Sequence, residues 1–376
     1  MIIAALNEST VDTRVAITPN AVKHYLKLGF EVRCEKNAGA ASGFSDAEYQ
    51  EAGASMATRK SLLKTTNILL CVNEPTPDDL DGLAAKALII GPIDNEENSK
   101  LLRWAVKENY SVFSMNLIPR ISRAQSMDSL SSQANLAGYR AVIEGVAHFN
   151  RAIPMMMTAA GMIHPAKILI LGAGVAGLQA IATAKRLGAV VYAFDVRRAA
   201  KEQIESLGAE FIEVSEDQDS ETSGGYASET TEEYRKLQAE LIDNYAKQAD
   251  IVISTALIPG RKAPILLTKK TVEQMKAGSI IVDLATARGG NCELSEKDKI
   301  VKHGGVTLIG YSNLPGLIPA TASELYATNL VNLVRLFAES APELFFNAED
   351  EIIKQALLCH DGNYMPFQKA KETTND

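Results

Sequence analysis

The sequence predicts two α/β domains with mostly parallel sheets, because short apolar runs alternate with helical patterns along most of its 376 residues. Such alternation is typical of βαβ units, and the chain is longer than one compact domain usually is. Glycines at 172, 174 and 177 directly follow one apolar run. We therefore expect two Rossmann-like or flavodoxin-like domains with a cleft between them, the first being discontinuous.

The first third of the chain contains apolar runs that we expect to be strands of the first domain. Residues 19–28 and 46–52 lie between these runs and have helical patterns. The tail at 349–365 is expected to form a short strand or hairpin that turns at Asp361 and Gly362. The predicted strands are MIIAAL from residue 1, FEVRCE from 30, NILLCV from 67, KALIIGPI from 86 and YSVFSMNLI from 110.

The second domain is predicted to begin with a long helix over 138–153 and to continue as βαβ units. Gly188, Gly208 and Gly278 stand just before strands, where the glycine that ends a helix is common. The predicted strands are KILILGA from residue 167, AVVYAFD from 189, AEFIEV from 209, DIVISTA from 250, SIIVDLA from 279 and VTLIGY from 306.

The domain boundaries follow from where these patterns change. We expect residues 1–132 and 318–376 to form the first domain and 133–317 the second, with a helix at 322–337 returning to the first. Residues 215–231 are acidic and rich in Ser, Thr and Gly, which predicts a loop that is either a disordered excursion or a functional lid.

Composition excludes several classes of function. The net charge of −8 argues against nucleic acid and against charge-driven docking on an anionic membrane. The four cysteines are scattered and contain no Cys-x-x-Cys pair, so we expect neither a disulfide framework nor a zinc site. The apolar run 168–184 is broken by three glycines, so we expect no membrane span, and the start lacks the features of a signal peptide.

The glycine turn predicts a dinucleotide site. Gly172 would allow the tight turn, Gly174 would let the backbone approach a pyrophosphate, and Gly177 would let the following helix pack against the strand. Asp195 ends the next predicted strand, where a carboxylate accepts ribose hydroxyls and repels a 2′-phosphate, so NAD is preferred over NADP. The plainer alternative is that these glycines serve only turn and packing. The neighbouring residues assigned to the same site are Val175, Ala176, Val196 and Arg197.

A second segment reads PRISRAQSMDSLSSQANLAGYR from Pro119 and has the composition of a polar loop that runs into a helix. It resembles the signature of the NAD(H)-binding component of proton-translocating nicotinamide nucleotide transhydrogenase. The resemblance continues through PMMMTAAG from Pro154, the glycine turn, TALIPG from Thr255 and GGNC from Gly289, and it covers nearly the whole chain. The segment RVAITP from Arg14 is similar to a wider group that also contains alanine dehydrogenase.

This resemblance implies a role for each matching residue. Arg120 and Asp128 would hold the carboxamide and ribose region of the nicotinamide, and Ser131 would face the same ring. Gln125 would lie nearest a second nucleotide, NADP(H), presented by a partner subunit. Without the resemblance, the simpler interpretation is that Arg120 and Asp128 form a surface ion pair. Gln125 and Ser131 would then cap the next helix. The other residues that match the family are Gly225 and Tyr226 in a mobile loop over the nucleotide, and Gln238 and Leu257 along the adenosine side and the cleft.

The resemblance also implies an activity and an assembly. The protein would be a homodimeric, peripheral component that exchanges hydride between bound NAD(H) and NADP(H) on a partner subunit, as a Si-specific/Re-specific NAD(P)+ transhydrogenase. A membrane-spanning subunit would couple the transfer to proton translocation. The expected location is the cytoplasm, on the inner face of a bacterial plasma membrane.

The alternatives are a stand-alone alanine-type dehydrogenase and a nucleotide-binding module without turnover. The related dehydrogenases use an Arg, a Lys, a His and an Asp to hold a carboxylate and move a proton. Arg14 is present, but Asn73 stands at the Lys position, no His occurs at 89–91, and Ala287 stands at the Asp position. The sequence therefore favours the transhydrogenase component, with no metal and no catalytic histidine expected.

Overall fold

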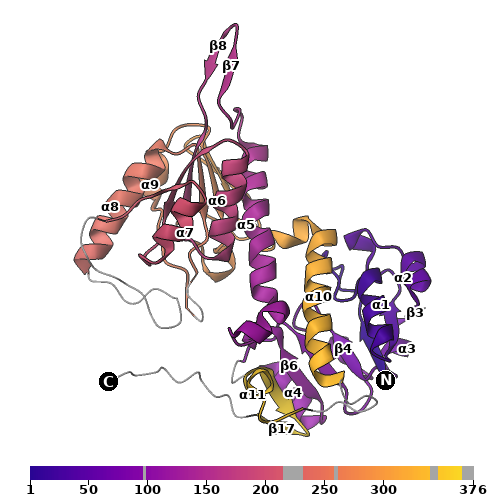
Figure 1. Cartoon of the computed structure of the whole chain (residues 1–376). Helices are drawn as coiled ribbons and strands as arrows, with labels where there is room; N and C mark the ends of the chain where they lie inside the picture. The colour runs from indigo at the N-terminus through magenta and orange to yellow at the C-terminus, as the bar shows by residue number, and fades with distance from the viewer. Residues whose placement is uncertain (96–98, 215–231, 258–260, 339–345, 366–376) are drawn as a thin grey trace. The chain divides into compact units, whose positions relative to one another are not determined.

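A computed structural model describes residues 1–95, 99–214, 232–257, 261–338 and 346–365. The chain divides into two compact units, one comprising Met1–Gln133 with the described residues from Pro315 onward, the other comprising Ala134–Leu314. Each unit contains a largely parallel sheet with helices packed on it, which confirms the predicted fold class (Figure 1).

The described residues of the first unit form an eight-stranded sheet in the order β17-β16-β6-β5-β4-β1-β2-β3. β1 to β6 are parallel, and β16 and β17 are added antiparallel at one edge. The central strands are buried on both faces, which explains their continuous apolar sequences. The strands are β1 Ile2–Ala5, β2 Glu31–Glu35, β3 Ser55–Ala57, β4 Ile68–Leu70, β5 Leu88–Gly91, β6 Ser111–Ser114, β16 Leu357–His360 and β17 Asn363–Tyr364.

Helices cover both faces of this sheet. Side chains of β1 alternate between two core clusters, with Ile3 in one and Ala4 in the other. One cluster contains residues from α1, α2, α10 and α11, and the other contains residues from α3 and α4. The helices are α1 Pro19–Lys27, α2 Asp46–Ala52, α3 Arg59–Leu63, α4 Lys100–Lys107, α10 Pro319–Ala338 and α11 Glu351–Ala356.

The helix predicted at 322–337 is α10, and it packs in the core of the first unit. Its Tyr326 hydroxyl donates to the backbone oxygen of Cys71 at 2.6 Å, and Leu330 and Val334 are buried beside Val22 of α1. These contacts tie α10 to α1 and to the residue after β4, both of which lie more than 200 residues earlier in the chain.

Two short elements of the first unit were not predicted. β3 is a three-residue edge strand with no buried residue, so its sequence carries little strand signal. α11 occupies the start of the tail that was expected to be only strand or hairpin, and Asp350 caps it by accepting from the Ile352 N–H. The hairpin itself is confirmed, because β16 and β17 pair across Asp361 and Gly362, which both have positive φ.

The second unit has a seven-stranded sheet in the order β11-β10-β9-β12-β13-β15-β14. Apart from β14, this is the parallel order of a Rossmann fold. The strands are β9 Lys167–Leu171, β10 Val190–Phe194, β11 Glu210–Phe211, β12 Ile251–Ser254, β13 Ile280–Asp283, β14 Ile300–His303 and β15 Val306–Ile309. The helices that follow or cover them are α6 Val175–Arg186, α7 Ala200–Ser206, α8 Glu232–Gln248 and α9 Lys269–Glu273.

Three features of the second unit differ from the sequence-based expectation or add to it. The long helix α5 (Ser129–His148) begins nine residues before the predicted start at 138, so it opens in the first unit. β14 was not predicted, and it pairs antiparallel with β15 through a turn at Gly304 and Gly305. β7 (Met156–Thr158) and β8 (Gly161–Ile163) form a separate hairpin that extends away from the seven-stranded sheet (Figure 1).

Candidate functional site

The glycine turn between β9 and α6 is built from close backbone contacts. Gly172 has φ +97°, and a Cβ added there would lie 2.7 Å from Thr255 Oγ1. A Cβ added at Gly177 would lie 1.8 Å from the backbone oxygen of Gly172, so only glycine lets α6 begin this close to the strand. A Cβ added at Gly174 would meet no atom within 4 Å. The turn is therefore packed against protein atoms at Gly172 and Gly177, whereas the space beside Gly174 is open.

The start of α6 fits an anionic group. Gly174 is the N-cap and contributes no side-chain hydrogen bond to the first turn. The N–H groups of Val175 and Ala176 thus lie at the positive end of a twelve-residue helix, and Val175 is exposed. Backbone donors, a positive dipole end and an open glycine are the features that hold a pyrophosphate. The residues present fit the dinucleotide predicted from the sequence.

Asp195 lies directly after β10 and is 8% exposed. Its Oδ2 accepts from the Ala173 N–H at 2.7 Å, which ties this strand end to the glycine turn. The Arg197 side chain lies against the same carboxylate, with Nε 2.9 Å from Oδ1 and Nη2 3.0 Å from Oδ2. The Arg197 backbone N–H donates to Oδ1 as well. A carboxylate has about four acceptor positions, and these contacts occupy them, whereas the sequence predicted an Asp195 open to ribose hydroxyls.

The segment that follows β12 lies against the glycine turn. Thr255 Oγ1 donates to the backbone oxygen of Gly172 at 3.0 Å. Leu257, assigned to the site from the sequence, is 47% exposed, and Gln238 lies half-buried on α8. Gly225 and Tyr226, assigned to a mobile loop, lie outside the described residues.

Asn291 holds both ends of the segment 256–264. Its Nδ2 donates to the backbone oxygens of Ala256 and Pro264, each at 2.8 Å, and its Oδ1 accepts from Ser254 Oγ at 2.7 Å. The Asn291 N–H donates to the buried carboxylate of Asp283 at 2.9 Å. Asn291 is completely buried with every side-chain polar group satisfied, so it supports the segment that contains Leu257. Sequence reasoning matched this asparagine to the family without assigning it a role.

Gly138 brings α5 against the glycine turn. A Cβ added at Gly138 would lie 2.0 Å from the backbone oxygen of Ala176 and within 2.9 Å of its Cα. Gly145 stands on the same helix, but a Cβ there would meet first a side-chain methyl of Ile251 at 3.0 Å. A glycine inside a strong helical pattern indicates a close packing contact. Of these two glycines, Gly138 is the one whose contact is with backbone atoms.

In the first unit, the segment after Pro119 forms the short 3-10 helix η4 (Ser122–Met127) and leads into α5. Ala124 and Met127 are buried in the core, which leaves Gln125 exposed between them. Arg120 precedes η4 and is also exposed. Gln125 is therefore exposed on a short turn that is anchored in the core by Ala124 and Met127.

Asp128 caps α5. Its Oδ1 accepts from the Ser131 N–H at 2.9 Å, and its Oδ2 accepts from Ser131 Oγ at 2.6 Å. These contacts form a helix cap, as the simpler interpretation expected, although Asp128 rather than Gln125 is the partner of Ser131. The nicotinamide contacts that the resemblance implied for Asp128 and Ser131 stay a prediction. At the other end of η4, Arg123 Nη2 lies 2.7 Å from Asp350 Oδ1, and this hydrogen bond holds the pKa of Asp350 below its ordinary value.

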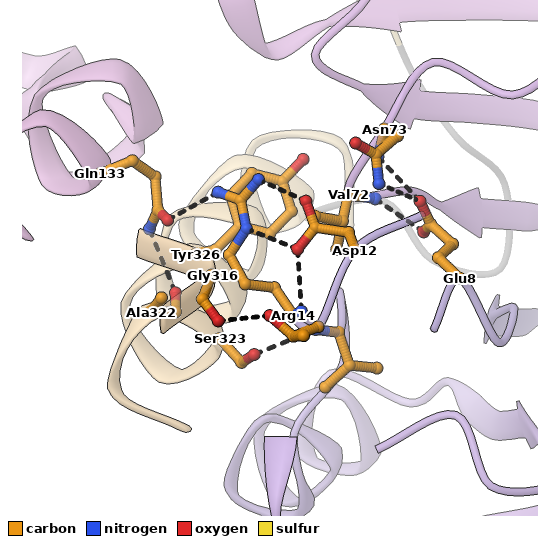
Figure 2. A network of polar contacts seen from close by, with 12 residues as sticks. Glu8, Asp12, Arg14, Val72, Asn73, Gln133, Gly316, Ala322, Ser323 and Tyr326 are labelled. Carbon is orange, nitrogen blue, oxygen red and sulfur yellow. Dashed lines mark hydrogen bonds and ion pairs between the residues drawn. The ribbon is translucent and has the colours of Figure 1, made fainter. Parts of the chain in front are cut away.

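Arg14, the one dehydrogenase-type residue that the sequence retains, is occupied by partners within the first unit. Its Nε and Nη2 donate to the Asp12 carboxylate at 3.0 and 2.8 Å, and its Nη1 donates to Gln133 Oε1 at 2.8 Å (Figure 2). Gln133 Nε2 donates in turn to the backbone oxygen of Ala322. The bidentate face of Arg14, which would bind a substrate carboxylate, is already paired with Asp12.

Asn73, which the sequence analysis expected at the position of the dehydrogenase lysine, serves as a structural donor. Its Nδ2 donates to Glu8 Oε2 at 3.0 Å, and the backbone N–H groups of Val72 and Asn73 donate to the same carboxylate at 2.8 Å (Figure 2). Burial raises the pKa of Glu8 despite these donors. An amide cannot move a proton at this position, so the arrangement differs from an acid–base site.

Within the described ranges, no helix is both long and apolar enough to cross a membrane. The same ranges contain no group of three or more His, Cys, Asp or Glu residues placed to hold a metal ion.

The chain matches two family models. Residues 5–137 match the N-terminal domain of alanine dehydrogenase/PNT, and residues 141–366 match the C-terminal domain. The first portion of NAD(P) transhydrogenase subunit alpha of Rhodospirillum rubrum is 46% identical over 360 residues, which are 93% of this chain and 94% of that protein. A crystal structure of transhydrogenase from Sinorhizobium meliloti has a TM-score of 0.88 and 45% identity, and the match covers 97% of this chain and 100% of that one. Alanine dehydrogenase 2 of Staphylococcus aureus is 28% identical over 83% of this chain and 80% of its own length.

Gly138→Ala is expected to weaken NADH binding by about tenfold or more, equivalent to ~1.4 kcal/mol. The added methyl would collide with the Ala176 backbone and shift the glycine turn, whereas the helix itself would gain up to about 1 kcal/mol in propensity. Fluorescence titration with NADH measures the effect. Gly145→Ala is the matched control on the same helix and is expected to bind NADH within about twofold of the wild type, because a side-chain methyl can move. Unchanged affinity in Gly138→Ala would refute the steric argument.

Proposed function

The chain belongs to the alanine dehydrogenase/PNT family, and from that premise we propose that it is the NAD(H)-binding component of a proton-translocating NAD(P) transhydrogenase. It passes hydride directly between NAD(H) bound on this chain and NADP(H) held by a partner subunit. The similarity to transhydrogenase alpha subunits, at 46% identity against 28% for an alanine dehydrogenase, supports this activity.

One observation carries the choice of reaction. The glycine turn expected of a dinucleotide site is present. By contrast, the two residues of the described chain that match the substrate-binding and acid–base positions of an amino-acid dehydrogenase are bound to neighbouring side chains. Arg14 is bound by Asp12, and Asn73 is bound to Glu8. Transfer between two nicotinamides needs no protein acid or base, since hydride leaves one ring and joins another. The protein has only to bind, orient and dehydrate the reactants.

The second unit supplies the proposed contacts to the adenosine and pyrophosphate end. The pyrophosphate takes the N–H groups at the start of α6, next to the open side of Gly174. Asp195 accepts the ribose hydroxyls, which replace Arg197 N–H groups on its carboxylate. Val196, Gln238 and Leu257 complete this part of the site, together with Gly225 and Tyr226. Arg197, once displaced, is a cation beside the bound nucleotide.

The first unit supplies the proposed contacts to the reactive end. When bound, NAD(H) supplies or accepts hydride at its nicotinamide ring. Arg120, Asp128 and Ser131 orient the carboxamide and the adjacent ribose. Gln125, exposed on η4, contacts the second nucleotide.

The proposed setting is a complex with membrane-spanning and NADP(H)-binding subunits, on the inner face of a bacterial plasma membrane. Coupling to proton translocation then resides in those partners. A Si-specific/Re-specific transfer, in which deuterium moves from one face of NADH only, belongs to the same proposal.

The test mixes the purified chain with NADH deuterated at C4, NADP+ and an isolated NADP(H)-binding component of a transhydrogenase. We expect deuterated NADPH to form only when both proteins are present, and analysis of the C4 position reports the stereochemistry. Oxidation of NADH by an oxo acid and ammonia with this chain alone would support an alanine-type dehydrogenase instead. Binding of NADH without either reaction would indicate a nucleotide-binding module.

Asp195→Ala is expected to weaken NADH binding by roughly 1–3 kcal/mol, because ribose hydroxyls and the Ala173 N–H lose their acceptor. Isothermal titration with NADH measures the loss. Asp250→Ala removes another carboxylate of the second unit, which accepts from the Lys167 N–H, and serves as the control. Equal affinities in Asp195→Ala and the wild type would remove Asp195 from the ribose site.

Gln125→Asn is expected to slow hydride transfer far more than it weakens NADH binding, because shortening the side chain withdraws its amide from the second nucleotide. Stopped-flow transfer rates and NADH titration on the same sample separate the two effects. Comparable losses in both would contradict a bridging role for Gln125.

The β7–β8 hairpin supports the proposed homodimer. Met155, Met156, Met157, Met162 and Ile163 are all at least 40% exposed, and an isolated two-stranded hairpin is marginal in water. Met157→Asp is expected to shift the chain from dimer to monomer in light scattering. A dimer that persists at the same concentration would place its interface elsewhere.

A further inference from the structure

We propose that Asn329 of α10 is a positioning residue for hydride transfer, because it fixes the turn that presents Gln125. The inference rests on the function proposed above and assigns a role to a residue on the returning helix. Asn329 is 7% exposed, and its neighbours Leu330 and Val331 are buried in the core of the first unit.

The turn at Gln125 depends on contacts from outside itself. η4 has six residues, and 3-10 segments of this length have poor hydrogen-bond geometry. Gln125 and Ser126 are both exposed, so their side chains contribute no core packing. The Gln125 backbone oxygen accepts a long bond of 3.2 Å from the Asp128 N–H at the end of the turn. The backbone between Ala124 and Met127 therefore needs a separate restraint.

Asn329 supplies that restraint at the residue next to Gln125. Its Nδ2 donates to the backbone oxygen of Ser126 at 2.9 Å. Asn332, which is half-buried one turn later on α10, donates to the same oxygen at 3.1 Å. The Ser126 peptide plane is thereby held by two amides from a buried helix.

The other end of the Asn329 side chain reaches α5. Ser132 Oγ donates to Asn329 Oδ1 at 2.7 Å. One amide thus joins Ser126 on η4 to Ser132 on α5, and the residues between these two points include Asp128 and Ser131. Three of the four residues proposed to act on the nicotinamides or at their boundary, Gln125, Asp128 and Ser131, lie within or directly beside the segment from Ser126 to Ser132. Positioning errors of about 1 Å at reacting groups cost on the order of a hundredfold in rate, so this restraint bears directly on transfer.

Asn329→Asp tests the role, because it keeps the shape and the acceptor for Ser132 but removes the donor to Ser126. We expect the rate of hydride transfer to the isolated NADP(H)-binding component to fall about tenfold to a hundredfold. The dissociation constant for NADH should change by less than about threefold, since the adenosine and pyrophosphate contacts belong to the second unit. A general loss of folding would change both.

Thr328→Ala is the control on the same helix. Thr328 is the neighbour of Asn329, but it is exposed and its hydroxyl donates to the backbone oxygen of Glu324 within α10. We expect less than about a threefold fall in the transfer rate, with circular dichroism and thermal unfolding recorded for both variants. Equal transfer rates in Asn329→Asp and the wild type, or equal losses in Asn329→Asp and Thr328→Ala, would overturn the proposal.

Two further measurements keep the outcome decisive. If Asn329→Asp does not fold, Ser132→Ala is the second variant, because it removes only the hydrogen bond between Ser132 and Asn329. We expect it to lower the transfer rate about threefold to tenfold at unchanged NADH affinity. No effect of Ser132→Ala would then overturn the proposal. Failure of the wild type to transfer hydride with the partner present would instead reject the proposed function, so the two failures are distinguishable.

Discussion

The candidate cofactor site depends on backbone contacts that leave no room for a side chain. Gly177 meets the backbone oxygen of Gly172, and Gly138 meets that of Ala176, at distances where a Cβ would overlap oxygen. These contacts seat the start of α6 between β9 and α5. Because the helix begins so near the strand, its free N–H groups open on the side where Gly174 has no neighbour. An anion site thus results from packing.

Within each unit, polar residues stabilise the segments that contain the candidate site residues, and most of them act on backbone groups. Asn291 closes both ends of the segment after β12 through two backbone oxygens. In the first unit, Asn329 does the equivalent for η4, and Asp128 caps α5. Buried amides suit this work, since one side chain offers two donors and an acceptor without the desolvation penalty of a charge.

The polar network around Arg14 explains how one family fold is compatible with different chemistry. In this chain Asp12 pairs with the guanidinium and Glu8 with Asn73, so the groups satisfy one another instead of facing a substrate. The same network joins the β1–α1 connection to α5 and α10 through Gln133 and Ala322. In this chain, Arg14 and Asn73 therefore stabilise the structure through Asp12 and Glu8.

The sequence by itself determined the parallel sheets, the positions of most strands along the chain and the glycine turn, because apolar periodicity and glycine spacing are local signals. It could not reveal β3 or α11, whose few residues carry weak signals, or that α5 begins at Ser129, since polar Ser and Gln residues obscure the helical pattern there. Only the tertiary structure placed Gly138 against Ala176 and Asn329 beside Ser126. Those contacts join residues up to 203 positions apart, and no pattern along a chain specifies which distant side chain will meet a given backbone oxygen once the core has packed.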